Sequence, residues 1–353
     1  EFTLDNMLDK YMTCVETLDN GNILANFASM QAEDGTTWDE AWDKAFEFRY
    51  PEMPEEPEPK DYEKGEEDAK YKSDLEEFNN EILPYWQNTH LKPFKHFAKW
   101  IYDTRWCDVN GNILPEITEE EALLRKEKFA KEKWQHLDVW KIAAYYVYAM
   151  RFGAVDQIVK NSMLTSEGPF AYNKNGVIED YNNESRWDGT DVTSDNYGKY
   201  YKWYYINYDN DTIMGVKNDG SLAYGPDILR TSVDKDGTYI YAGSNSTLWN
   251  NLDADDEFKN EILPLVDQGI SRTMTYKKAI NMFDVEQVGK WCERLYNKDA
   301  EYKYINPYIS NWEYSGDTQE VFADKLYMLQ GSRTAHRHWW LSKRFNLFDG
   351  KWN

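Results

Sequence analysis

Apolar side chains recur every three or four positions through much of the chain, which predicts a helix-dominated structure. Each run with this spacing places its apolar side chains on one face of an α-helix. The runs cover residues 1–50, 75–151, 248–263, 277–296 and 319–348. They predict amphipathic helices that pack on a common core, and no internal repeat is expected to organise them.

The pattern changes between residues 165 and 245, where Tyr, Thr, Asn, Asp and Gly become frequent. Residues 202–208, Lys-Trp-Tyr-Tyr-Ile-Asn-Tyr, are rich in residues that favour strands. Asn-Gly and Asp-Gly pairs, which are typical of tight hairpin turns, occur at 175–176, 219–220 and 236–237. The sequence therefore predicts an α+β fold in which helices dominate and a small strand-rich part is embedded.

Residues 51–74 differ from both patterns because proline alternates with glutamate. Proline blocks helix formation and like charges repel one another. We expect a solvated loop inserted into a helical layer.

Overall charge excludes several classes of function. The chain has 353 residues and a formal net charge of −23. Such a surface repels phosphate backbones and anionic lipid, so we expect neither nucleic-acid binding nor attraction to membranes. No apolar run approaches the roughly 20 residues of a bilayer-spanning helix.

Cysteine usage and the first residue add two smaller expectations. Cys14, Cys107 and Cys292 are scattered and lack CxxC spacing, so reduced structural thiols are expected instead of a disulfide framework or a zinc site. The chain begins at Glu1 instead of Met. This favours a processed product or a fragment of a larger protein.

The sharpest candidate for chemistry combines two polar segments. Asp156 and Asn161 follow a hydrophobic helix, and Asp209 and Asp211 follow the predicted strand, with Gly215 close behind. Carboxylate and amide oxygens that converge in this way are suitable ligands for Mg²⁺. The same residues also fit turns, helix caps or a calcium site, and these alternatives remain open.

Protein kinases use this set of side chains for phosphoryl transfer. One Asp orients or deprotonates the acceptor hydroxyl, and an Asn and a later Asp hold the metal ions. Asp156-x4-Asn161 matches the spacing of the kinase catalytic loop, and Asp209 or Asp211 takes the position of the later Asp. The flanking His-Arg and Phe-Gly residues of a typical protein kinase are absent here.

At these residues the sequence resembles the spore-coat CotH kinase family, an atypical kinase-fold group. The matching stretches are 136–138, 144–146, 153–161, 202–211, Gly215 and 245–250. The resemblance implies a centre like a kinase C-lobe, with Asp156 as the catalytic Asp. It further implies Asn161, Asp209 and Asp211 as metal ligands or their support, with Mg²⁺ and ATP as cofactors.

A second resemblance covers more of the chain and is to tail proteins of podovirus-type phages, including the crAss-like group. It rests on the stretches 42–51, 156–161, 208–215, 246–250, 331–340, 344–345 and 348–349. It implies a structural component of the virion tail, made in the bacterial host cytoplasm, with other tail subunits as partners in a homo-oligomer. In that family the kinase-like region is embedded in a much larger polypeptide.

Together these observations predict three regions. They are a helical region over 1–135 that contains the acidic loop, a CotH-like core with the strands over 136–275, and a helical region over 276–353. No Gly-rich phosphate loop occurs and no N-lobe Lys is identified. An inactive structural domain is therefore expected ahead of two alternatives, which are an active Mg²⁺-dependent kinase and a module that binds a host-surface receptor or glycan.

The C-terminal region carries the densest basic group, formed by Arg333, Arg337, Lys343 and Arg344. In an acidic chain such a group favours a subunit contact, because opposite charges steer assembly. His336 and His338 lie in the same stretch without a carboxylate or Cys partner at matching spacing. We interpret them as part of a packed helix.

Overall fold

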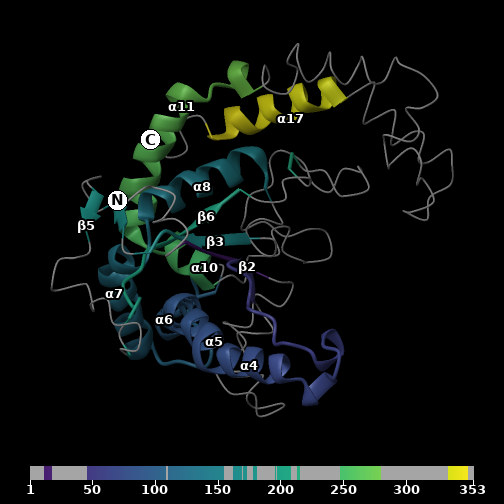
Figure 1. The fold of residues 1–353 in the computed structure, drawn as a ribbon. Helices are drawn as coiled ribbons and strands as arrows, with labels where there is room; N and C mark the ends of the chain where they lie inside the picture. Colours follow the sequence, from purple (N-terminus) through teal and green to yellow (C-terminus); the bar gives the residue numbers. More distant parts are fainter. Residues whose placement is uncertain are drawn as a thin grey trace, which may run out of the picture. The chain divides into compact units, whose positions relative to one another are not determined.

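A computed structural model shows a mixed helical and sheet protein in which helices dominate, as the sequence predicts (Figure 1). The residues that it describes are 12–17, 46–108, 110–154, 162–168, 170–172, 178–180, 195, 197–207, 213–214, 247–279 and 333–348. Two compact units interleave along the chain. The first unit comprises 1–142, 159–208 and 243–255, and the second comprises 143–158, 209–242 and 256–353.

The first unit contains a four-stranded antiparallel sheet in the order β2-β1-β3-β6. Its strands are β1 (Thr13–Thr17), β2 (Phe46–Tyr50), β3 (Ser162–Ser166) and β6 (Trp203–Ile206). Strand β6 lies inside the predicted strand at 202–208. A two-stranded sheet pairs β4 (Phe170–Tyr172) with β5 (Ile178–Asp180).

Strands β1 and β2 correct the helical prediction for residues 1–50. Phe46 and Phe48 are buried, whereas Glu47 and Arg49 are exposed. This period of two is that of a strand with one buried face. The helical prediction grouped Phe46 with residues 42 and 45 and missed the alternation that starts at Phe46.

One continuous helix runs from residue 69 to residue 104 in the first unit. It consists of α4 (Ala69–Glu77), η4 (Phe78–Ile82), α5 (Leu83–Trp86), η5 (Gln87–Leu91) and α6 (Lys92–Thr104), and the residues at each junction are helical. Both π-helical stretches end two residues before a proline. Stretch η4 ends at Ile82, before Pro84, and η5 ends at Leu91, before Pro93. In a regular α-helix the proline ring would collide with the carbonyl four residues earlier, and the wider π turn relieves that collision.

The predicted apolar stripe of this helix covers the sheet. Phe94 lies edge-on to Phe46 and Phe48, with ring centroids 4.8 and 5.6 Å away. Phe97 stacks on Trp203 of β6 at 5.3 Å. These aromatic contacts join the long helix to strands that come from both ends of the first unit's sequence.

Two further helices are described in the first unit. Helix α7 (Glu119–His136) begins with a capping box between Thr118 and Glu121. Helix α10 (Thr247–Asp253) places Trp249 on Tyr205 of β6 with a stacked centroid distance of 5.1 Å. No helix among the described residues is both long enough and apolar enough to cross a membrane.

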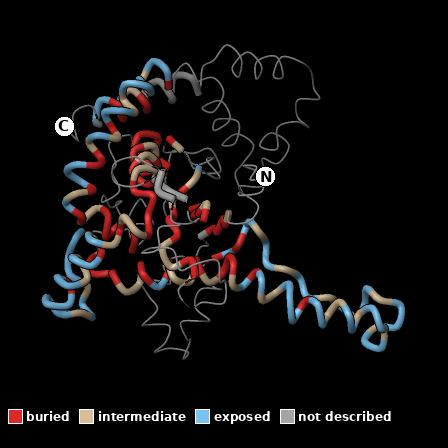
Figure 2. Tube along the Cα trace, turned by 60° about the vertical axis from the view of Figure 1, so that its left-hand side comes forward, coloured by how far each residue is buried: buried red, intermediate tan, exposed pale blue. Residues whose placement is uncertain are grey.

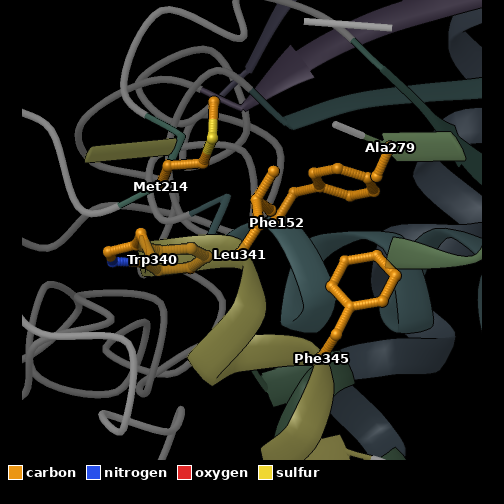
Figure 3. Close-up of a cluster of buried hydrophobic side chains, with 6 residues drawn as sticks. All are labelled: Phe152, Met214, Ala279, Trp340, Leu341 and Phe345. Atoms are coloured by element: carbon orange, nitrogen blue, oxygen red, sulfur yellow. The ribbon is translucent and has the colours of Figure 1, made fainter. Parts of the chain in front are cut away.

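The second unit has its own apolar core, shown in Figure 3. The chain enters it in α8 (Val139–Phe152), and η8 (Phe258–Ile262), α11 (Leu263–Thr273) and α17 (Arg333–Phe348) also belong to it. A buried cluster joins Phe152, Met214, Ala279, Trp340, Leu341 and Phe345. The predicted helices over 137–151 and 248–263 have described counterparts, and α17 covers residues 333–348 of the one predicted over 319–348. Residues 280–296 of the helix predicted over 277–296 lie outside the described residues.

A short repeat corrects the expectation of a chain without repeats. Residues 77–84 read Glu-Phe-Asn-Asn-Glu-Ile-Leu-Pro, and residues 257–264 differ from them only at the third position. Both copies form a five-residue π-helix followed by an α-helix with proline at its second position. Their burial differs, because Ile262 is 3% exposed and Ile82 is 43% exposed.

The loop at 51–74 is mainly irregular, as predicted, although α4 already begins at Ala69. It contains two short 3₁₀ turns, η2 (Pro59–Asp61) and η3 (Gly65–Glu67). We call residues 51–77 the arm. Figure 2 shows exposed and half-buried positions along it, and none of its residues is buried.

Two histidines of the first unit, His90 and His136, are buried. His90 Nδ1 lies 2.9 Å from Thr13 Oγ1 on β1. His136 stacks on Trp100 with a centroid distance of 4.6 Å. Burial lowers the pKa of His90 to about 4 and that of His136 to about 3.

We predict that stability falls as the pH drops from about 6.5 towards 4. The unfolded histidines, with an ordinary pKa near 6.5, take up protons in this range while the buried rings stay neutral. The charges that face His136 and lower its pKa further belong to Lys199, Lys128 and His96. The free energy of unfolding should fall by about 2 kcal/mol per histidine by pH 4.5. Urea unfolding at a series of pH values measures this fall. His136→Phe keeps the stacking and should flatten the dependence relative to the native chain; an unchanged slope contradicts the assignment.

Candidate functional site

The four candidate residues Asp156, Asn161, Asp209 and Asp211 lie outside the described residues, as does Gly215. Their flanks are described. Segment 155–161 runs from the end of α8 to the start of β3, and segment 208–212 follows β6 and precedes Ile213. The geometry of these flanks is what the structure contributes to the candidate site.

The C-terminus of α8 fixes the point from which segment 155–161 departs. Gly153 has a φ of 63°, a conformation that glycine adopts without strain. The Ala154 N–H donates to the Ala149 carbonyl at 2.9 Å. This is the Schellman arrangement that ends many helices.

Other chain segments satisfy two more carbonyls at this helix end. Arg344 Nε donates to the Met150 carbonyl at 2.6 Å, and Met214 N donates to the Phe152 carbonyl at 2.7 Å. Met214 has a φ of 60°, which is uncommon for a residue other than glycine. The hydrogen bond between Phe152 and Met214 holds a point four residues before Asp156 beside a point three residues after Asp211.

Within the first unit, the sheet fixes the other ends of the two segments. Strands β3 and β6 are antiparallel, with Met163 opposite Ile206. The start of β3 and the end of β6 therefore lie at the same edge of the sheet. Asn161 directly precedes β3, and Tyr208 lies two residues after the end of β6.

A buried ion pair supports α8 at the same end. Arg151 Nη2 and Nε lie 2.6 and 2.9 Å from Asp267 Oδ1, and Nη2 also donates to Ser271 Oγ at 2.7 Å. Arg151 is 1% exposed. A buried guanidinium without such a carboxylate would be costly, so the pair ties the end of α8 to α11 within the second unit.

A polar cluster that the sequence did not predict as functional lies at the opposite edge of β3 and β6. Lys141 Nζ is 3.3 Å from Glu167 and 3.6 Å from Asp138, and it lies 3.9 Å from the centre of the Tyr204 ring. Tyr204 Oη donates to Glu167 Oε1 at 2.6 Å. Burial raises the pKa of Asp138, and the Lys141 backbone hydrogen bond and charge oppose the rise. Burial, followed by Glu167, raises the pKa of Tyr204.

The cluster has a structural explanation. Asp138 Oδ1 accepts the Lys141 N–H at the start of α8, and Asp138 N donates to the Trp203 carbonyl. Asp138 therefore caps α8 and ties it to β6. The spacing of Asp138 and Lys141 at the start of an apolar helix was the available signal for this cap.

No alternative metal site occurs among the described residues. Among the residues that the structure describes, no group of three His, Cys, Asp or Glu side chains is placed to hold a metal ion. Cys14 and Cys107 are buried thiols that contact Thr165 Oγ1 and the Asn250 carbonyl, respectively, whereas Cys292 lies outside the described residues.

The basic C-terminal group requires one correction. Arg344 is fully buried and donates to the Met150 carbonyl, so it cannot contribute to a subunit contact. Lys343, its neighbour on α17, is exposed. The side chains of Arg333, Arg337, His336 and His338 lie outside the described part.

No protein-family model, curated protein or solved structure matches this chain.

Proposed function

We propose that the protein is a structural subunit of a larger assembly, of the kind that the resemblance to phage tail proteins implies. It contacts neighbouring subunits through the arm, residues 51–77. The observation that carries this proposal is that an arm with defined secondary structure buries none of its own side chains.

The energetics of α4 explain why this observation matters. Helix α4 forms the first nine residues of the continuous helix over 69–104, and none of these nine residues is buried, so packing, which supplies most helical stability in proteins, does not support this end. Its internal support is local: Asp68 caps its N-terminus, and Tyr62 donates to Asp74. An arm that contributes so little to its own core is suited to a contact with another molecule.

Excision of the arm tests the proposal. Replacing residues 52–76 with a short Gly-Ser linker should leave the thermal unfolding midpoint nearly unchanged, because no buried contact is lost. Sedimentation velocity between 1 and 100 µM should then show discrete oligomers for the native chain and monomers for the excised chain. Oligomers that persist without the arm, or a native chain that stays monomeric, contradict the proposal.

A second candidate function is Mg²⁺-dependent phosphoryl transfer, favoured by the described residues on either side of the segments 155–161 and 208–212. Their flanks meet in the β3–β6 pairing and in the hydrogen bond between Phe152 and Met214. The order helix, Asp-Asn segment, strand, strand and acidic segment also agrees with the CotH resemblance. In this function Asp156 orients the acceptor hydroxyl, and Asn161, Asp209 and Asp211 hold Mg²⁺ on ATP.

Ligand-dependent stability separates this candidate from a purely structural role. An active site predicts that Mg²⁺ with ATP raises the unfolding temperature, and that Asp209→Ala abolishes the rise. Glu119→Ala, at the start of α7 and far along the chain from the candidates, is the matched control and should keep it. Equal shifts in both variants, or no shift in the native chain, count against the kinase.

Host-surface or glycan binding stays a prediction from aromatic content. No tryptophan whose side chain the structure describes is fully exposed, and most are buried. Tyr50 and Tyr85 are 40% and 52% exposed, and flat exposed rings of this kind are what a glycan surface would use.

A further inference from the structure

The arm and the long helix that follows it separate charge along the chain. Residues 51–81 contain thirteen acidic side chains and four lysines. Residues 86–99 contain three lysines and two histidines, with no acidic side chain. The first stretch is therefore strongly negative and the second positive, and the two follow each other closely along the chain of the first unit.

The positive stretch borders a groove of about 560 Å³. Its lining residues are Gln87, Asn88, Leu91, Lys92, Lys95, His96, Lys99 and Asp195. Lys99 is also paired with Asp103 at 2.8 Å, and burial lowers the pKa of His96. The lysines thus supply the positive charge of the groove, and Asp195 in its lining and Asp103 beside Lys99 offset part of it. In a chain with a net charge of −23, such a groove is a local attraction for an acidic surface.

Exposed apolar side chains lie between the two charged stretches. Ile82 is 43% exposed and Tyr85 is 52% exposed. Met53, on the outgoing leg of the arm, is 55% exposed, and the Pro51 carbonyl accepts the Trp86 Nε1–H at the root of the arm. In the repeated motif the counterpart of Ile82, Ile262, is buried, whereas the counterpart of Tyr85, Leu265, is 61% exposed.

We propose that a second copy of this chain covers this face as an antiparallel, two-fold symmetric partner. The acidic arm of each copy lies on the lysine groove of the other, and Ile82 and Tyr85 of both copies meet near the axis. The inference rests on the proposed function and names the surface through which the first neighbour is recruited.

Charge determines the orientation. A parallel arrangement would place acidic arm on acidic arm and lysine on lysine, which costs free energy. An antiparallel arrangement joins opposite charges twice and uses one self-complementary patch, as a two-fold interface requires. With the axis near Pro84, Lys92 of one copy lies opposite Glu76 of the other, and Lys95 lies opposite Ser73, about one helical turn from Glu76 and Glu77. The helix over 69–104 is roughly 50 Å long, long enough for both halves to overlap.

Charge reversal with compensation tests this pairing by sedimentation equilibrium. The double variant Lys92→Glu/Lys95→Glu should weaken dimerisation at least tenfold, and so should Glu76→Lys/Glu77→Lys. Combining all four reversals in one chain should restore the dimer to within about threefold of the native chain. Raising the salt concentration should weaken the native dimer, because exposed ion pairs are screened.

A matched control separates specific pairing from net charge. Lys131→Glu/Lys259→Glu makes the same change in net charge at exposed lysines outside the groove and should leave the dimer unchanged. Circular dichroism establishes that each variant is folded, and Lys92→Gln/Lys95→Gln repeats the test with a smaller change. Oligomers that require the arm but ignore the groove reversals would overturn this inference and leave the proposed function standing. Four reversals that fail to restore association, or a control that weakens it equally, would also overturn the inference.

Discussion

Asp267→Ala is expected to destabilise the second unit by about 3–5 kcal/mol, the range for breaking a buried ion pair from one side. Arg151 is 1% exposed, and its guanidinium also lies 5.1 Å from the centre of the Phe345 ring. Removing the carboxylate leaves this cation in an apolar site with Ser271 as its remaining side-chain hydrogen-bond partner among those described above. Hydrogen exchange of the peptides that cover α8 and α11 measures the effect directly.

Two companion variants define the cause of that loss. Arg272→Ala removes an exposed cation one turn away, which donates to Gln268 at 3.1 Å, and should change stability by less than about 0.5 kcal/mol. Arg151→Met with Asp267→Leu removes both charges and should recover much of the stability, because paired apolar replacements are often tolerated. Equal protection in native and Asp267→Ala proteins would show that the pair does not hold α8.

Trp203→Ala is expected to destabilise the first unit by about 3–5 kcal/mol, since it removes a large buried side chain and leaves a cavity. Trp203 is fully buried between Phe94 and Phe97, with centroids at 5.4 and 5.3 Å. It joins β6, the strand that precedes segment 208–212, to the long helix. Urea unfolding followed by circular dichroism measures the change.

The conservative replacement gives the sharper test. Among the described residues the indole N–H of Trp203 has no hydrogen-bond partner, and a buried unsatisfied donor is destabilising. Trp203→Phe removes that donor while keeping most of the ring, so it should cost well under half of the alanine effect. Leu124→Ala, at a side chain 61% exposed on α7, should be nearly neutral. Equal losses for Phe and Ala would contradict this explanation.

Helices with a complete apolar stripe could be predicted from the sequence. Phe94, Phe97 and Trp100 recur at helical spacing and are buried in α6, and the run after Leu137 forms α8. The strand candidate that contains Trp203 and Tyr205 was equally clear because aromatic residues favour strands. In these stretches local spacing and tertiary burial agree.

Strands β1 and β2 could not be predicted from the same signal. Each has five residues, which is too short to establish a period against the helical pattern around it. Their pairing depends on β3, whose Leu164 lies opposite Val15 nearly 150 residues away along the chain. Contacts of that range leave no trace in local spacing.

The candidate site shows the same division between features that local spacing predicts and features that depend on long-range contacts. Spacing selected Asp156-x4-Asn161 and the acidic pair after β6, but it carried no information on how their flanks are fixed. The hydrogen bond from Met214 to Phe152 and the 2.6 Å contact of Arg344 with Met150 are long-range features. Arg344 looked like a surface charge because its burial depends on α17 packing in the second unit.

Native mass spectrometry of the intact chain tests the central claim of an arm-mediated assembly most directly. Spectra recorded between 1 and 50 µM at low ionic strength should show the native chain as dimers or higher even-numbered oligomers, with the arm-excised chain as single copies. A native chain that is detected only as single copies at every concentration would contradict the account.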